Sequence, residues 1–395
     1  MQIPTPAVAL AFLCCGWAPF SRAQTDSDLF DDTLVRDLRL YVHSSDWRKL
    51  RANYLNNTYY PADLVWEGLM VQNVGIRSRG RGSRNAAKPG LRVDFDRFED
   101  DQEFLGLKSL VLDNLTQDPP MARERLAMMF FRRLGIAAPR EAYARLYVND
   151  EYVGLYSLVE PIDKRFLRRN LDDDSGFLYE YSWAFPYDFS HLGDDPSLYV
   201  PLPFKPQTRE KNPAPEVIAA MARAIHRSSD AEFETAASAY IDLKEWLAYV
   251  AVENFIAESD GFLGEVGMNN FYLYRPAGGT RFRIIPWDKD ATFYWAAHPV
   301  TYQLESNVLT RRALAIPELR KYYFAVLTAC ADAADEGGWF ASEARRLTDQ
   351  AYRASLEDSN KPYSNEEFEE AVRVFRYFAA ERSRVVRETA AEAIR

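Results

Sequence analysis

Two aspartates stand at the end of a short apolar run in the second half of the chain. Phe282–Ile285 is typical of a buried strand, Pro286 and Trp287 end it, and Asp288 and Asp290 follow with one residue between them. An isolated D-x-D is more often a polar turn with two solvated acids than a functional site. Carboxylates that leave a strand together can also hold a divalent cation, because magnesium and calcium prefer oxygen ligands. The surrounding sequence has to separate these two interpretations.

Further oxygen-bearing side chains come before this strand. Asp260 stands where a predicted helix ends, and Asn269 and Asn270 follow nine and ten residues later. Phosphoryl transfer needs an acid that orients the acceptor hydroxyl and an Asp and Asn oxygen cage for magnesium. Asp260, Asn270 and Asp288 supply these residue types in the order in which kinase folds use them. The choice between Asn269 and Asn270 stays open, and Asp290 either assists the metal or orients its neighbours.

A basic, glycine-rich turn lies in the first half of the chain, between two predicted strands. Residues 77–84 read RSRGRGSR, which is not a Walker A loop. Glycines let the backbone approach a ligand closely, and backbone N–H groups together with arginines can hold an anion. Kinase-like folds cover nucleotide phosphates with such a turn, although a solvated hairpin tip fits the residues equally well. The candidate nucleotide-binding residues here are Arg79, Gly80, Gly82, Ser83 and Lys88.

Two glutamates complete the candidate set. Glu124 lies in the helix predicted after Pro120, where a kinase-like lobe would use it to hold the strand lysine; a surface pair one helical turn apart is the alternative. Glu160 ends a strand where the first half of the chain gives way to the second. A carboxylate at that junction can line a nucleotide pocket or cap the helix that follows.

The elements that must position these residues divide the chain into two parts. Period-two alternation predicts a β-rich part at residues 35–165, which contains one prominent helix and a hairpin that turns at Asn149-Asp150. Residues 166–395 are mostly helical, with amphipathic helices from about residue 310 to the end and a two-stranded insert that carries Asp288. We therefore predict an α+β fold of two lobes with a cleft between them. The acidic residues 24–34 are predicted to form a loose leader.

Composition limits the class of protein. The chain has 395 residues, of which 47% are hydrophobic and 14% aromatic, so a large core is expected and disorder is not. A net charge of −10 argues against a general nucleic-acid binder, which would show a basic face. The four histidines are scattered, and Cys330 is the one cysteine beyond residue 15, so no zinc site and no intrachain disulfide are predicted.

The first 23 residues predict export from the cytoplasm. An apolar run of signal-peptide length is followed by Ser21 and Ala23, the small residues that signal peptidase requires. A lipoprotein anchored through Cys14 is less favoured, because the preceding Leu13 is large. No stretch is long enough to span a membrane. We expect a secreted or envelope-associated protein.

At this point the sequence resembles the CotH kinase family, the spore-coat protein H group of atypical protein kinases. The resemblance is carried by RSRGRGSRNAAKPGLRVDF, by N-x-x-Y-x-G-x-Y-x-x-x-E within LYVNDEYVGLYSLVEPIDKRFL, by NNFYLY and by P-W-D-x-D within FRIIPWDKDATF. It runs from about Leu38 to the terminal FRYFAAERSRVVRE. The family commonly has an R-G-N-S-S-like turn and paired lysines where this chain has R-G-R-G-S-R.

The resemblance implies a divergent bilobal kinase fold that transfers phosphate from ATP to serine on a protein. By position, Asp288 would bind magnesium or manganese and Asp260 would orient the acceptor hydroxyl. Lys88 would contact the nucleotide phosphates, and Glu160 would lie at the nucleotide-binding junction. The acceptor would be a protein with serine-rich segments.

Two other functions fit parts of the sequence. One is a catalytically weak or inactive surface protein that keeps the fold for recognition or structure. The other is a calcium-stabilised, carbohydrate-active protein, in which two carboxylates flank a sugar, although no spacing selects that pair. The acids at 260, 288 and 290 favour the kinase, because a binding protein has no need of them.

Overall fold

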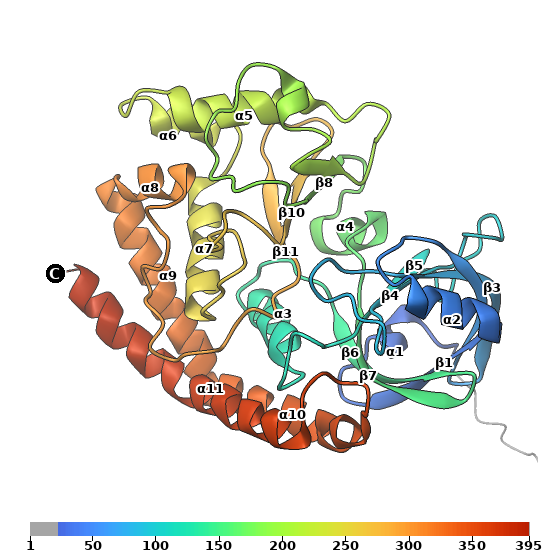
Figure 1. The fold of residues 1–395 in the computed structure, drawn as a ribbon. Helices are drawn as coiled ribbons and strands as arrows, with labels where there is room; N and C mark the ends of the chain where they lie inside the picture. Colours follow the sequence, from blue (N-terminus) through green and yellow to red (C-terminus); the bar gives the residue numbers. More distant parts are fainter. Residues whose placement is uncertain (1–22, 395) are drawn as a thin grey trace, which may run out of the picture.

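The computed structural model describes residues 23–394, so the predicted signal peptide lies, apart from Ala23, outside the described residues. Seven strands of the first half form a closed barrel, and the second half is mainly helical around a four-stranded sheet (Figure 1). The predicted two-part α+β fold is confirmed. Within residues 23–394 no helix is both long and apolar enough to cross a membrane.

The barrel has the strand order β1-β2-β3-β4-β5-β7-β6 and closes where β1 pairs with β6 in parallel. Neighbouring strands are otherwise antiparallel. The strands are β1 (Val35–Val42), β2 (Tyr60–Trp66), β3 (Leu69–Ser78), β4 (Leu91–Asp94), β5 (Ser109–Asp113), β6 (Glu141–Val148) and β7 (Glu151–Val159). The short helices α1 (Asp26–Leu29) and α2 (Ser44–Ala52) accompany the barrel.

Apolar side chains that alternate along the strands fill the barrel interior. Leu38 and Leu40 in β1 are fully buried, whereas Tyr41 between Leu40 and Val42 is exposed. The β6–β7 hairpin turns at Asn149 and Asp150, which have φ of 50° and 67°. Asn and Asp tolerate this left-handed conformation, as two-residue hairpin turns require, so the predicted turn is confirmed.

The second half contains the sheet β11-β10-β8-β9 and most of the helices. Its strands are β8 (Phe177–Tyr181), β9 (Phe204–Pro206), β10 (Phe271–Arg275) and β11 (Arg283–Pro286). Its helices are α4 (Lys164–Leu171), α5 (Pro215–Arg227), α6 (Phe233–Ser238), α7 (Leu243–Phe255), α8 (Val308–Leu314), α9 (Pro317–Asp335), α10 (Trp339–Glu357) and α11 (Asn365–Ile394), with short 3₁₀ turns at Pro196–Leu198 and Glu336–Gly338.

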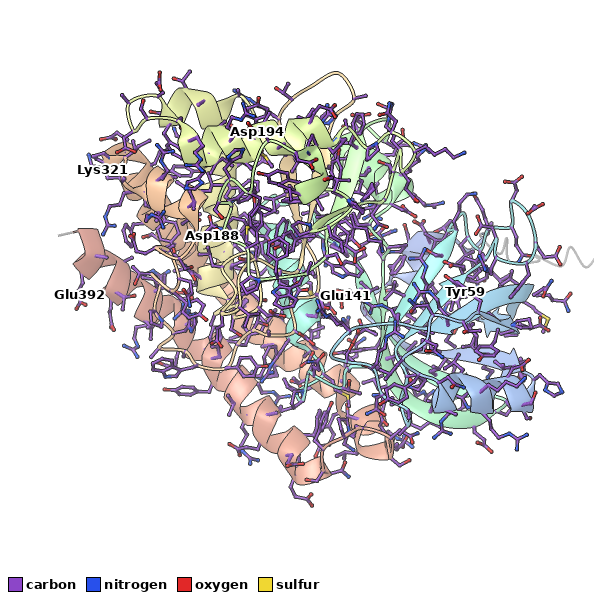
Figure 2. All side chains as sticks on the ribbon, turned by 45° about the horizontal axis from the view of Figure 1, so that its top comes forward. Tyr59, Glu141, Asp188, Asp194, Lys321 and Glu392 are labelled. Atoms are coloured by element: carbon purple, nitrogen blue, oxygen red, sulfur yellow. The ribbon has the colours of Figure 1, made fainter. Side chains whose placement is uncertain are left out.

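The helix α3 (Arg123–Arg133) joins the two halves. It follows β5 in sequence, but its apolar face packs on the helical core: Phe130 stacks on Phe255 of α7 at 4.9 Å, and Phe131 lies 5.2 Å from Tyr249. Helices α10 and α11 run along the lower edge of the helical half, and α10 contacts the barrel at β7 (Figure 1). The packing units therefore cross the predicted boundary at residue 165, and side chains of both halves lie between the barrel and the helices (Figure 2).

The predicted loose leader is wrong for the described part of residues 24–34. Leu29 and Phe30 are buried. The Asp26 carboxylate accepts a hydrogen bond from Arg140 at 2.7 Å and forms an ion pair with Arg165 at 3.2 Å. The segment is acidic because its partners are arginines from both halves of the molecule, and it is held in place by them.

Candidate active site

A cavity of about 810 Å³ lies between the glycine-rich turn of the barrel and the acids of the helical half. All the predicted site residues line it except Lys88, Glu124 and Glu160. The lining members are Arg79, Gly80, Gly82, Ser83, Asp260, Asn270, Asp288 and Asp290. Residues more than 170 positions apart in the sequence thus face one space, as the predicted order of motifs requires.

The two asparagines both contact Asp260. The Nδ2 atoms of Asn269 and Asn270 each donate to Asp260 Oδ2 at 3.0 Å, and Asn270 Nδ2 also donates to the Asp260 carbonyl at 3.0 Å. With its nitrogen committed to Asp260, the amide of Asn270 keeps its oxygen as the atom that could bind a cation. The loop that carries Asp260 and the start of β10 are therefore fixed to each other.

Left-handed backbone occurs at two of the three residues predicted to bind the metal. Asn270 has φ of 57° and Asp288 has φ of 52°, and the Trp287 N–H donates to the Asn270 carbonyl at 3.2 Å. Residues other than glycine with positive φ are uncommon and cluster at functional sites, because the surrounding structure has to maintain them. Asn and Asp tolerate this conformation, which accounts for the residue types at these two positions.

Carboxylates crowd one side of the cavity. Burial and the nearby Asp113 raise the pKa of Asp288 to about 6, with the Arg79 guanidinium acting in the opposite direction. Burial and Asp288 raise the pKa of Asp290 well above its usual range. Glu124 is buried too, and burial, Glu141 and Asp288 raise its pKa strongly. Such a cluster favours protons or a cation.

The glycine-rich turn is held rigidly. Gly80 has φ of 101°, and a Cβ there would lie 2.4 Å from Ser83 Oγ, so the tight turn requires glycine. Arg84 braces it by donating to the carbonyls of Gly80 at 2.7 Å and Tyr54 at 3.0 Å. The Arg79 guanidinium donates to Asp113 at 3.1 Å. Arg79 is therefore a barrel cation that faces the acids.

Lys88 does not reach the cavity, and this corrects its predicted phosphate contact for the conformation described. Its side chain is fully buried, and Nζ lies 2.6 Å from Asp358 Oδ2, which is also fully buried. Burial lowers the pKa of Lys88, and Asp358 partly offsets this effect. Lys88 joins the barrel to the chain after α10. The cation that faces the cavity, where the sequence analysis placed Lys88, is Arg79.

The two predicted glutamates also lie outside the cavity lining. Glu160 is bonded to arginines: Arg140 donates to it at 2.9 Å, and Arg169 of α4 donates through two nitrogens. These bonds occupy both carboxylate oxygens, so Glu160 holds the junction between the halves together. Glu124 faces the buried acids and Arg79, and no pairing with Lys88 is observed in residues 23–394.

Two site residues were missed by the sequence analysis. Asp113 ends β5 and accepts hydrogen bonds from Arg79 and from the Leu115 N–H. Its signal is an acid at the end of the apolar run SLVL, the same pattern that singled out Asp288. Lys289, between the two predicted acids, is fully buried and points away from the cavity.

The donor set fits an open site for a hard cation. Asp288, Asp290 and Asn270 offer oxygens on the cavity wall; the pKa of Asp288 is raised by burial first and by the like charge of Asp113 second, and a bound cation would offset both. In residues 23–394 no group of three or more His, Cys, Asp or Glu side chains is placed to hold a metal ion by itself. Magnesium typically takes one or two protein carboxylates and completes its shell with phosphates and water.

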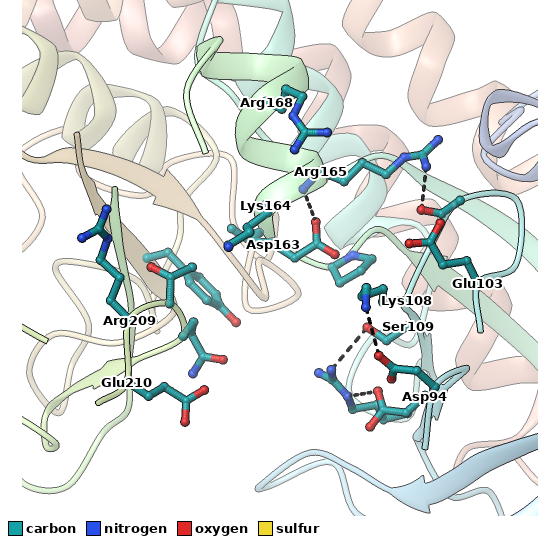
Figure 3. Close-up of a pocket in the computed structure, with 18 of the residues that line it drawn as sticks. Asp94, Glu103, Lys108, Ser109, Asp163, Lys164, Arg165, Arg168, Arg209 and Glu210 are labelled. Carbon is teal, nitrogen blue, oxygen red and sulfur yellow. Dashed lines mark hydrogen bonds and ion pairs between the residues drawn. The ribbon is translucent and has the colours of Figure 1, made fainter. Parts of the chain in front are cut away.

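A second cavity, of about 1110 Å³, adjoins the first. The two share the rings of Tyr272 and Trp287, whose centroids are 5.7 Å apart. Pro161 and Ile162, which follow Glu160 at the junction of the halves, line its wall. Figure 3 shows charged side chains around it, with Lys108 and Asp94 on the barrel side and Arg209 opposite.

Comparison with known proteins identifies the family. The model of the CotH kinase protein family matches residues 76–386, which includes the glycine-rich turn and all the acids described above. The chain belongs to this family, and the resemblance noted in the sequence is confirmed.

Individual relatives share this domain. Inner spore coat protein H of Bacillus subtilis (strain 168) is 27% identical over 297 residues, which is 72% of this chain and 78% of that protein. Invasin CotH7 of Rhizopus delemar is 22% identical over 287 residues, 69% of this chain but 46% of the invasin. The Helicobacter pylori proinflammatory kinase CtkA aligns over 77% of this chain and 94% of its own at 11% identity, with a TM-score of 0.31, which is too low to assign a fold.

Proposed function

We propose that this protein is an atypical protein kinase that transfers the γ-phosphate of ATP to serine on a protein acceptor. The observation that carries the proposal is the meeting of Asp260, Asn270 and Asp288 with the Arg79–Ser83 turn across one cavity. Acids alone would also suit a hydrolase. The opposed glycine-rich, arginine-bearing turn selects phosphate as the ligand.

Each residue has a distinct part in the transfer. Asp260, held by two asparagine amides, orients the acceptor hydroxyl and takes its proton as the phosphoryl group passes from the leaving ADP to the serine oxygen. Asp288 and Asn270 would hold Mg²⁺ or Mn²⁺, with Asp290 beside them, and the cation would neutralise charge on the phosphates. Arg79 and the backbone N–H groups of the turn bind the phosphates from the barrel side.

The second cavity suits the nucleoside. It opens beside the phosphate site across Tyr272 and Trp287, and Ile162 supplies an apolar contact. A nucleotide laid across both cavities would put its base near the junction of the halves and its γ-phosphate beside Asp288. This arrangement supports ATP rather than inorganic phosphate as the donor.

The protein's setting is proposed to be the cell envelope or the exterior. Relatives named as a spore coat protein and as an invasin support this location, as does the signal peptide predicted at residues 1–23. ATP is scarce there, so transfer would occur during export or in a compartment supplied with ATP.

The test uses purified protein from residue 24 onward, with labelled ATP, Mn²⁺ or Mg²⁺ and a serine-rich acceptor. We expect wild-type transfer and at least a roughly 1000-fold loss in Asp288→Asn, because most of the catalysis is positioning and electrostatic stabilisation. Asp349→Asn is the control, since Asp349 lies on α10, outside both cavities, and forms an ion pair with Arg376. Absence of both transfer and a nucleotide-dependent thermal shift would favour the binding-protein alternative.

A further inference from the structure

The lysine of P-W-D-K-D faces the protein interior. Lys289 Nζ donates to Glu253 Oε1 at 2.8 Å, and the two side chains are 0% and 2% exposed. Glu253 lies in the last turn of α7, just before the loop that carries Asp260. The two aspartates around Lys289 line the cavity, so this short turn has a cavity side and a buried side.

The partners of Lys289 hold the main chain around Asp260. Both oxygens of Glu253 accept from the Phe262 N–H, at 3.1 and 3.0 Å. Oε1 of a second buried glutamate, Glu258, accepts from the Asp260 N–H at 2.7 Å. Two carboxylates therefore fix the backbone at Asp260 and two residues beyond it.

Charge ties Lys289 to both glutamates. Burial alone would lower the pKa of Lys289, but Glu253 and Glu258 raise it above its usual range. Burial raises the pKa of Glu258 to about 8, and Lys289 acts against that rise. The Lys289 ammonium thus supplies the counter-charge to Glu253, which would otherwise be a buried unpaired carboxylate, and burying an unpaired charge is costly.

The loop is packed directly on these carboxyl side chains. A Cβ added at Gly261 would lie 2.4 Å from Glu253 Oε1 and 2.6 Å from Glu258 Cγ. The Ser259 N–H also donates to the Ala291 carbonyl at 3.1 Å, which links the loop to the acidic turn through the main chain. A shift of Lys289 or of either glutamate would therefore move Asp260 relative to Asp288.

We propose that Lys289 is a positioning residue that fixes the Asp260 loop (residues 258–262) against the acidic turn (residues 287–291). It thereby sets the spacing between the acid that orients the acceptor and the carboxylate that holds the metal. The inference rests on the proposed kinase function and adds a residue that touches neither substrate nor metal. Misplacement of reacting groups by about 1 Å costs on the order of 100-fold in rate, and outer-shell partners of metal ligands matter by about 10- to 100-fold.

The experiment compares Lys289→Met with the control Arg312→Met. Arg312 is largely buried and donates to the carbonyls of Ile225 and Ser228, outside the cavity. Four quantities are measured: kcat, KM for ATP, Mn²⁺ affinity, and hydrogen–deuterium exchange of residues 258–262 and 287–291.

In Lys289→Met we expect kcat to fall about 100-fold and Mn²⁺ affinity about tenfold. KM for ATP should stay within about threefold, because Arg79 and the glycine-rich turn are untouched. Exchange should become faster in both segments. Arg312→Met should lower the unfolding temperature without any of these changes.

The outcomes separate the two proposals. Full kcat in Lys289→Met, or an equal loss in Arg312→Met, would overturn the positioning role while leaving the kinase intact. If the wild-type protein neither transfers phosphate nor binds Mn²⁺, the proposed function fails. In that case, unchanged hydrogen–deuterium exchange in residues 258–262 of Lys289→Met would overturn the positioning role independently. Should Lys289→Met not fold, Glu253→Gln, which still accepts from the Phe262 N–H, is put through the same measurements.

Discussion

Two fully buried lysines, each paired with a buried carboxylate, serve different parts of the described chain. Lys88 lies 2.6 Å from Asp358, and Lys289 lies 2.8 Å from Glu253. Burial lowers the pKa of Lys88, which faces the one carboxylate of Asp358 at contact distance. Two glutamates outweigh burial and raise the pKa of Lys289.

The partners decide what each lysine does. Asp358 also accepts from the N–H groups of Leu155, Asn360 and Lys361, so the Lys88 pair fastens the barrel to the chain after α10. The partners of Lys289 hold the loop of Asp260. Burial of a lysine beside an acid is therefore no guide to function; the backbone that its partner holds is the better guide.

The largest expected effect separates the two lysines in catalysis. Lys289→Met should lower kcat about 100-fold by displacing the acids. Lys88→Met, where it is folded, should keep its KM for ATP within about twofold of the wild-type value. Steady-state kinetics at a temperature where both variants are folded makes the comparison. A tenfold or greater rise in KM for Lys88→Met would restore the phosphate contact predicted from the sequence.

The next effect concerns stability. Lys88→Met leaves Asp358 buried without a counter-charge, so the free energy of unfolding should fall by about 3–5 kcal/mol. The double variant Lys88→Met with Asp358→Asn should recover part of this loss, since it removes the unpaired charge, although asparagine keeps only one of the two oxygens that accept from the Leu155, Asn360 and Lys361 N–H groups. Denaturant unfolding measures both, and no recovery would mean that packing rather than charge dominates.

A smaller effect on catalysis tests the role of Lys289 through its partner Glu253. Gly261→Ala would place a Cβ 2.4 Å from Glu253 Oε1 and should lower kcat about tenfold. Gly278→Ala, in the β10–β11 hairpin, is the matched control, because nothing lies within 4 Å of its added Cβ. Equal kinetics for the two alanine variants would show that the loop can absorb the shift.

The smallest effect is on pH dependence. Burial raises the pKa of Asp118 to about 6 and of Glu141 and Glu258 to about 8, so the folded protein binds these protons more tightly than the unfolded chain. Unfolding then releases protons, and the free energy of unfolding falls as pH rises from about 4 to about 8. Thermal unfolding should show a lower midpoint at pH 8 than at pH 5.5, and Glu258→Gln should flatten the slope. A rising midpoint would contradict these directions.

Local patterns predicted much of the fold and the centre of the site. Alternation of apolar and polar residues predicted most barrel strands. The glycine-rich turn and the acids after β11 were recognisable from their residue types. The order Asp260, Asn270, Asp288 was enough to predict that these residues converge, because a short hairpin must bring the last beside the first two. Strands β8 and β9 were not singled out in the mostly helical second half, since β10, which pairs with β8, follows much later in the chain.

Partners distant in sequence explain the errors. Lys88 was assigned to phosphate because nothing near it in the chain reveals Asp358. The leader looked loose because Arg140 and Arg165, which hold Asp26, lie far along the chain. Lys289 was passed over because a lysine between two acids is expected to be solvated. Burial of charge depends on long-range pairing, which one sequence does not display.

We propose that the cavity between the two halves binds a metal–nucleotide complex. Crystals grown with Mn²⁺ and a non-hydrolysable ATP analogue test this binding by anomalous scattering. We expect a manganese peak in contact with Asp288 and Asn270, with the analogue's phosphates against the Arg79–Ser83 turn. A nucleotide bound elsewhere, or manganese in contact with neither residue, would contradict it.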